Sequence, residues 1–169
     1  DVYKRQEDDK TLRETSCDPK FRRALVTDGK SAVGQAVARA LLDAGCPTVF
    51  LGDPQAWKRD DAFDALAADP RVQTVVLDVT DTDSVERAAA SIGGKVEILV
   101  NTADLEREGG LLGRKDVNTA RDAMDVNVLG LMRLAQCFGP ALCGRAADGV
   151  NSATAWVNVL SIYCLLYTS

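Results

Sequence analysis

The sequence contains no histidine among its 169 residues. Histidine is the general base of the Ser-His-Asp and Cys-His types of active site and a frequent ligand of zinc. Its absence therefore excludes both types of catalysis and most zinc chemistry, and we predict no metal site. Any proton transfer by this chain would have to use Tyr, Lys, Asp, Glu or an ordered water.

Three other features are missing. The five cysteines show no CxxC spacing, which is typical of thiols in a reducing compartment, so we expect a cytoplasmic protein. Basic residues are not in excess: there are 20 Lys and Arg against 25 Asp and Glu, and a net charge of −5 argues against a nucleic-acid partner. No signal peptide is recognisable and no apolar run looks long enough to span a bilayer, so no membrane partner is expected.

The remaining composition, 46% hydrophobic and 27% charged, is that of an ordinary globular protein, and the length suits one domain. Residues 1–20 are polar and lack periodicity, which predicts a disordered arm before a domain at 21–169. Residues 1–6, DVYKRQ, resemble translated sequencing-adaptor read-through, as does the closing CLLYTS. A short natural tail is the alternative for 1–6.

The stretch 24–46 combines an apolar run, a glycine-bearing turn and an amphipathic helix. Apolar residues recur at helical spacing over 33–44, and Gly45 is typical of a helix end. A strand that turns directly into a helix aims unpaired N–H groups and the positive end of the helix dipole at one point, which suits a pyrophosphate. Gln35 and Ala36 occupy positions where an ATP- or GTP-binding P-loop needs Lys and Ser or Thr, so that kind of site is excluded.

Segments typical of strands and helices alternate along the rest of the chain. The near-continuous apolar run 72–77 is typical of a strand covered on both faces. Trp57 is expected in the core, and Asp83 with Glu86 is expected to form a capping box. The alternation predicts an α/β fold with a doubly wound parallel sheet. The expected later strands are 48–51, 72–77, 96–100 and 155–160, and the expected helices are 57–67, 83–92 and 117–138.

Polar residues follow four of the expected strands. In an open parallel sheet the carboxyl ends of the strands form the ligand-binding edge, so these residues are candidates for a common site. Simpler interpretations are also open: Asp78 could start a helix, Asn101 could cap a turn, and Ser161 could be a solvated strand end. The four segments are Thr27 to Gly34, Asp78 with Val79, Asn101 to Ala103, and Ser161.

Asn127 lies within the apolar stripe of the expected helix 117–138. An unpaired amide on such a face costs about 1 to 3 kcal/mol, so the side chain should have a partner. Asn127 could bond a neighbouring carbonyl and fix the packing, or it could hold a water or a backbone kink beside a site, and the two roles are compatible. The stripe consists of Ala120, Met124, Val128, Leu131, Ala135 and Phe138.

Taken in order, these segments resemble the short-chain dehydrogenase/reductase family over residues 24–161. The turn is similar to the family's TGxxxGxG pattern, with Asp28 and Ala32 where glycines are usual, and Asp104 replaces the last residue of the family's Asn-Asn-Ala-Gly motif. The family's Asp-Val pair, active-site Asn and active-site Ser also have counterparts. The matching residues are Thr27, Gly34, Asp78, Val79, Asn101, Ala103, Asn127 and Ser161.

The resemblance implies a Rossmann-like sheet of about five strands, incomplete at its C-terminal end, and hydride transfer between NAD or NADP and a hydroxyl or carbonyl carbon of a small-molecule substrate. Ser161 would hydrogen-bond the substrate oxygen, and Asn127 would support the proton relay. Relatives often pair through the helix that carries Asn127, so the full-length parent is expected to be a homo-oligomer. The residues expected to bind the cofactor are Thr27, Asp28, Lys30, Ser31, Val33, Gly34, Asp78, Val79, Asn101 and Ala103.

Two departures from the family concern charge near the cofactor. Asp28 places a carboxylate beside the expected pyrophosphate position and Asp104 places another nearby, so affinity is expected to be weak unless Lys30 offsets the charge. The choice between NAD and NADP stays open, because Asp53 after the second strand favours NAD through the ribose hydroxyls whereas Lys30 favours NADP.

A third departure concerns the general acid. In the family a Tyr follows the active-site Ser by about thirteen residues and a Lys follows that Tyr, and counting on from Ser161 passes the end of this sequence. Tyr163 and Tyr167 are too close to the strand end to take that position. This chain is therefore expected to be inactive in hydride transfer. The alternative is a non-catalytic dinucleotide-binding or scaffolding domain, which the missing glycines favour; a sugar-nucleotide epimerase fits the spacing of the turn less well.

Overall fold

The structure is a computed structural model that describes residues 16–105, 118–147 and 153–160. Strands and helices alternate, as the sequence predicts. The strands are β1 (Arg23–Val26), β2 (Thr48–Asp53), β3 (Val72–Val76), β4 (Ile98–Asn101) and β5 (Ala155–Asn158). The helices are η1 (Pro19–Phe21), α2 (Ala32–Asp43), α3 (Asp61–Ala67), α4 (Thr82–Ala88), η2 (Ala89–Gly93), α5 (Asn118–Met124), η3 (Asp125–Gly130) and α6 (Leu131–Ala147).

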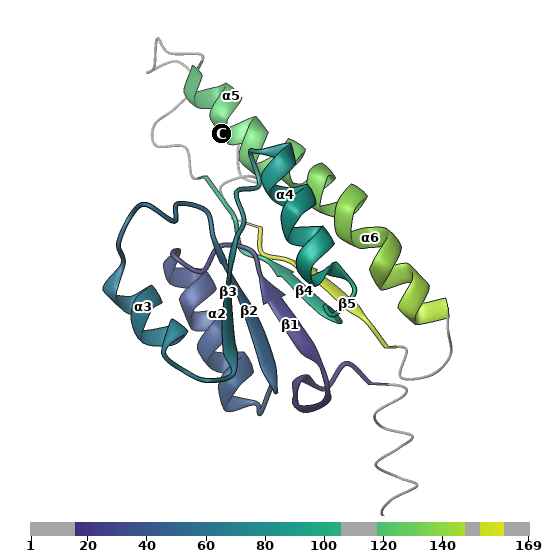
Figure 1. The fold of residues 1–169 in the computed structure, drawn as a ribbon. Helices are drawn as coiled ribbons and strands as arrows, with labels where there is room; N and C mark the ends of the chain where they lie inside the picture. The colour runs from purple at the N-terminus through teal and green to yellow at the C-terminus, as the bar shows by residue number, and fades with distance from the viewer. Residues whose placement is uncertain (1–15, 106–117, 148–152, 161–169) are drawn as a thin grey trace, which may run out of the picture.

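The five strands form one parallel sheet in the order β3-β2-β1-β4-β5. Helices α2 and α3 cover one face, and α4 and α6 cover the other (Figure 1). The strand order reverses at β1: β2 and β3 lie on one side of β1, and β4 and β5, which come later in the chain, lie on the other. The predicted doubly wound parallel α/β fold is confirmed.

The core is divided into two layers by the alternation of side chains along the strands. Ala24 and Val26 of β1 face α2 and α3, while Leu25 between them faces α4 and α6, and all three are fully buried. Successive side chains of a strand point to opposite faces, so a central strand covered on both sides must be apolar throughout.

Helix α2 begins and ends as its sequence indicates. Ser31 is the N-cap, and its Oγ accepts a hydrogen bond of 3.0 Å from the N–H of Gly34. At the other end Gly45 has a φ of 85°, the left-handed conformation that terminates helices at little cost only in glycine.

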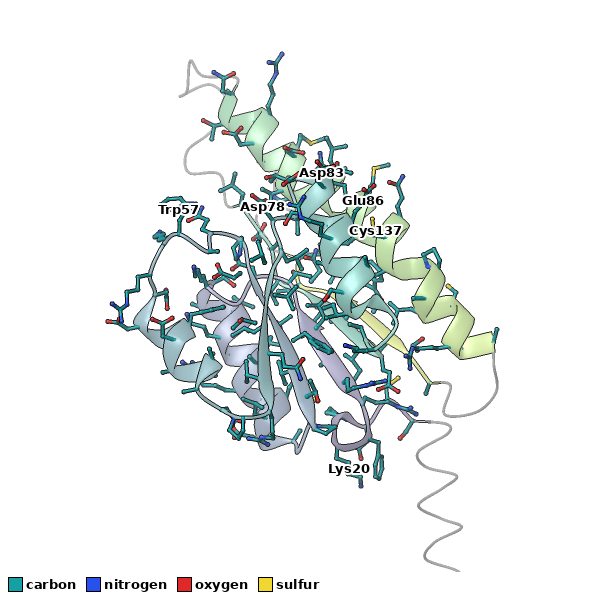
Figure 2. All side chains as sticks on the ribbon, in the orientation of Figure 1. Lys20, Trp57, Asp78, Asp83, Glu86 and Cys137 are labelled. Atoms are coloured by element: carbon teal, nitrogen blue, oxygen red, sulfur yellow. The ribbon has the colours of Figure 1, made fainter. Side chains whose placement is uncertain are left out.

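Strand β3 and the loop before α3 differ from the prediction. β3 is an edge strand of the described sheet, with Val76 60% exposed, so the expected cover on both faces is wrong. Trp57 is 83% exposed and not in the core (Figure 2). The reason is local: the carboxylate of Asp60 caps the N–H of Phe63, so α3 starts only at Asp61 and Trp57 stays in the preceding loop.

Helix α4 begins earlier than the expected capping box. Its N-cap is Asp81, whose Oδ1 accepts a hydrogen bond of 3.0 Å from the N–H of Asp83. Because Asp83 therefore lies inside the first turn, the capping box of Asp83 with Glu86 is wrong.

The expected helix 117–138 is found as the run α5-η3-α6, which continues to Ala147. Its buried face agrees with the predicted stripe at Phe138 but otherwise differs: Leu134 and Leu142 are buried, whereas Met124 is 55% and Val128 is 41% exposed. The π-helical turns of η3 change the helical period, which rotates the face that meets the sheet.

The run Asn118–Ala147 is also long and apolar enough, by length and composition, to cross a membrane, contrary to the prediction that no such run exists. A core helix of a globular protein meets the same criterion. In this structure the α6 part of the run packs on the sheet.

The N-terminal arm was predicted to extend to residue 20. Residues 16–20 instead have a defined conformation, because Pro19 starts a 3-10 helix whose N-cap, Asp18, accepts a hydrogen bond of 3.1 Å from the N–H of Lys20. The guanidinium of Arg22 also donates to the carbonyl of Ser16.

Candidate functional site

The carboxyl ends of β1, β2, β3 and β4 surround a cleft of about 260 Å³. The glycine-bearing turn, the Asp-Val pair and the Asn-containing segment all reach this edge of the sheet, as expected for right-handed crossovers. Figure 2 shows Asp78 at this edge, after β3. Residues that line the cleft include Thr27, Asp28, Gln55, Asp78, Val79 and Ala103.

Thr27 and Asn101 connect the ends of β1 and β4. The hydroxyl of Thr27 donates to Oδ1 of Asn101 at 2.8 Å and accepts hydrogen bonds from the N–H groups of Thr102 (3.0 Å) and Ala103 (3.3 Å). Thr27 and Asn101 are buried, so this network is protected from water. In this structure the Asn101 side chain therefore supports a turn, in agreement with the simpler interpretation of this residue.

Asp28 occupies the turn that precedes α2. Its Oδ1 accepts hydrogen bonds from the N–H groups of Lys30 (2.9 Å) and Ser31 (3.1 Å), and Oγ of Ser31 donates to the carbonyl of Asp28 at 3.0 Å. Burial raises the pKa of the Asp28 carboxyl, and the two N–H groups act against that rise. The carboxylate is thus directed at the backbone donors of its own turn.

Two glycines permit the close approach of the backbones around the turn. A side chain at Gly34 would collide with the carbonyl oxygen of Asp28, and one at Gly52 would collide with that of Thr27. Sequence reasoning identified Gly34 but missed Gly52. A glycine near the end of a strand is a signal of close backbone approach and could have revealed it.

Lys30 and Asp53 form an ion pair of 2.7 Å, and both side chains are largely buried. The same ammonium group donates to the carbonyls of Gln55 and Lys58, both at 2.5 Å, and lies over the ring of Phe63. The expectation that Lys30 offsets the charge of Asp28 is therefore met only in part: the ammonium lowers the pKa of Asp28, but its ion-pair partner is Asp53, whose charge raises that pKa.

The turn after β3 carries Asp78 and Val79. Oδ1 of Asp78 accepts hydrogen bonds from the N–H (2.9 Å) and the hydroxyl (2.7 Å) of Thr80, and Val79 is buried against Gly130. Arg133 donates to the carbonyl of Val79 at 3.0 Å and so ties α6 to this turn. No motif in the sequence identified Arg133.

Asn127 has the partner that its position requires. Its Oδ1 accepts a hydrogen bond of 2.9 Å from the N–H of Leu105, and its Nδ2 donates to the carbonyl of Leu105 at 3.2 Å. Asn127 is half-buried and lies on the π-helical η3. Ser161, the other predicted catalytic residue, lies outside the described residues.

Val33, predicted to bind the cofactor, lies in the first turn of α2 and is exposed. Among the described residues, no group of three or more Cys, Asp or Glu side chains is placed to hold a metal ion.

Known proteins are similar to this chain in sequence and in fold. A cis-4-hydroxycyclohexanecarboxylate dehydrogenase of Sinomonas cyclohexanicum is 35% identical over 82% of this chain and 54% of its own length. An L-xylulose reductase of Mesocricetus auratus is 31% identical over 85% of this chain and 59% of its own length. A crystal structure of a short chain dehydrogenase from Burkholderia cenocepacia in complex with NADP is 31% identical, with a TM-score of 0.70 over 86% of this chain and 55% of the other.

The chain spans about half the length of these relatives. The family model for short chain dehydrogenases matches residues 22–165, which include every segment that surrounds the cleft. The chain therefore belongs to the short-chain dehydrogenase family.

Proposed function

We propose that the protein to which this chain belongs is an NAD(P)-dependent oxidoreductase acting on a hydroxyl or carbonyl group of a small-molecule substrate. The observation that carries the proposal is the convergence of Thr27 and Asp28 of the turn, Asp78 with Val79, and Ala103 around one cleft, with Asn101 bonded to Thr27 beside it. It is supported by relatives that are dehydrogenases and reductases and by a similar structure in complex with NADP.

The residues around the cleft fit most of a dinucleotide. Asp78 and Val79 would lie beside the adenine, Asp53 would face the adenosine ribose, and Asn101 with Ala103 would support the nicotinamide side. The close approach of Gly34 and Gly52 to neighbouring carbonyls makes the compact turn that a pyrophosphate site needs. The donors of the turn fit less well, because Asp28 already uses two of them.

The bound cofactor would supply the hydride acceptor or donor. Ser161 would bind the substrate oxygen, and Asn127 would act as a positioning residue through its bonds to the backbone of Leu105. The 169-residue sequence has no Tyr and Lys at the family's spacing after Ser161. For this chain by itself we therefore propose dinucleotide binding without turnover.

A second candidate is a non-catalytic dinucleotide-binding or scaffolding domain. The occupied donors of the turn favour this candidate, because they lower the affinity for a cofactor. The two candidates differ in one measurement, turnover by the full-length protein.

Calorimetry with NADH and NADPH tests binding by this chain, and oxidation of both with a panel of ketones and aldehydes tests turnover. We expect binding by the chain and turnover only by the full-length protein. Turnover by the chain itself would contradict the roles assigned here. Binding without turnover by the full-length protein would favour the non-catalytic domain.

The full-length protein is proposed to be a cytoplasmic homo-oligomer that pairs through the α5-η3-α6 run. Met124, Val128 and Met132 are exposed at four-residue spacing along this run, which leaves an apolar strip for a partner helix. Sedimentation of the full-length protein tests the pairing, and a monomer at all concentrations would exclude it.

A further inference from the structure

At the N-terminal end of α2, backbone N–H groups are hydrogen-bonded to a carboxylate of the chain itself. Oδ1 of Asp28 lies 2.9 Å from the backbone nitrogen of Lys30 and 3.1 Å from that of Ser31, and Oγ of Ser31 accepts the N–H of Gly34. In proteins that bind a pyrophosphate between strand and helix, such N–H groups face the phosphate oxygens. In this chain those donors already have acceptors.

The negative charge around the cleft further disfavours the binding of a pyrophosphate. Among the described residues, the cation that acts on the Asp28 carboxyl is the ammonium of Lys30, which is paired with Asp53 at 2.7 Å. Asp78 and Asp104 also line the cleft, and the described lining residues include no Lys or Arg. A pyrophosphate that enters the cleft therefore meets the Asp28 carboxylate, and the described lining residues offer no cation to offset its charge.

We propose that the Asp28 carboxylate competes within the chain for the donors that a dinucleotide pyrophosphate would use, so a dinucleotide binds only when this carboxylate leaves the N–H groups of Lys30 and Ser31. The inference rests on the proposed function and deepens it, because it identifies the residue that limits cofactor affinity. The adenosine half of the cofactor does not use these donors and is not affected.

The competition makes dinucleotide binding tighter at lower pH. Burial raises the pKa of Asp28 in the free chain, and an adjacent pyrophosphate raises this pKa further because like charges disfavour the ionised carboxylate. A pKa that is higher in the complex than in the free chain means that binding takes up a proton, so affinity increases as pH falls. Among the described residues, Lys30 of the same turn and Asp53 of β2 act on Asp28 by their charge, and Asp78 after β3 and Asp104 after β4 line the same cleft.

Calorimetry with NAD⁺ and with adenosine, between about pH 5.5 and 8, tests the inference, because the pyrophosphate of NAD⁺ does not titrate in this range. The variants are Asp28→Gly, which removes charge and acceptor, and Asp28→Asn, which keeps a side-chain oxygen but removes the charge. Asp43→Asn, an exposed residue at the far end of α2, is the matched control. Cooperative thermal unfolding shows that each variant is folded.

We expect Asp28→Gly to tighten NAD⁺ binding about tenfold at the upper pH and Asp28→Asn to tighten it less. Both should lose the pH dependence, and adenosine affinity should stay the same in all variants. If Asp28→Gly does not fold, the affinity and pH profile of Asp28→Asn test the inference in its place. Wild-type binding that neither variant tightens overturns this inference alone. If the wild type and all variants bind neither NAD⁺ nor adenosine, the proposed function fails as well.

Discussion

The ammonium group of Lys30, in the turn before α2, lies 2.7 Å from Oδ1 of Asp53, the last residue of β2. From the sequence, these two residues are expected to favour different cofactors, and in the structure their charges neutralise each other. The pair also holds the loop after β2 against the turn, because Lys30 donates to the carbonyls of Gln55 and Lys58.

Lys30→Ala should shift cofactor preference toward NADH. The substitution frees the Asp53 carboxylate to accept the ribose hydroxyls and to repel a 2′-phosphate, so the ratio of NADPH to NADH dissociation constants should rise by about tenfold. Lys58→Ala removes the same charge from an exposed position of the loop and is the control. Calorimetry with both nucleotides measures the ratio, and an unchanged ratio would show that Asp53 does not face the ribose.

Thr27→Val should destabilise the chain by about 1 to 3 kcal/mol, because it removes the acceptor of the buried N–H of Thr102 and the hydroxyl that bonds Asn101. Thr74→Val, at an exposed position of β3, should change the free energy of unfolding by less than about 0.5 kcal/mol. Urea unfolding followed by circular dichroism measures both. Equal effects of the two substitutions would contradict the structural role of Thr27.

Gly34→Ala and Gly52→Ala should each destabilise the chain by about 1 to 3 kcal/mol or more, because the added carbon collides with a backbone oxygen that cannot rotate away. Gly139→Ala within α6 is the matched control. A side chain at Gly139 meets no atom within 4 Å, so alanine should be neutral or stabilise by about 0.5 to 1 kcal/mol. Thermal unfolding of the three variants tests the contrast, and equal melting temperatures would argue against it.

Asn127→Ala should loosen the segment around Leu105, because the substitution removes both bonds to its backbone. We expect the N–H of Leu105 to exchange with solvent about 2 to 10 times faster, which corresponds to the loss of about one hydrogen bond. Asn158→Ala, at an exposed position of β5, is the control and should leave this rate unchanged. Hydrogen exchange measured by NMR reports the rate, and an unaltered rate in Asn127→Ala would show that the contact is not stabilising.

Local sequence patterns were sufficient to predict the features that depend on residues close together in the sequence. The apolar spacing and Gly45 predict the end of α2, because the helical face and the left-handed residue are properties of that segment alone. The alternation of strands and helices predicts the parallel sheet, since right-handed crossovers leave few other topologies. That topology in turn brings Asp78 and Asn101 to one edge with the turn after β1.

The sequence by itself thus determined the fold class, the start and end of α2, and the edge of the sheet at which the polar segments meet. Tertiary structure alone decided that β3 is an edge strand, that Lys30 pairs with Asp53, and that the Thr27 hydroxyl bonds the side chain of Asn101. Strand order and the ion pair depend on contacts between residues far apart in the sequence. The hydrogen bond between Thr27 and Asn101 likewise joins residues that lie 74 positions apart, which no local pattern encodes.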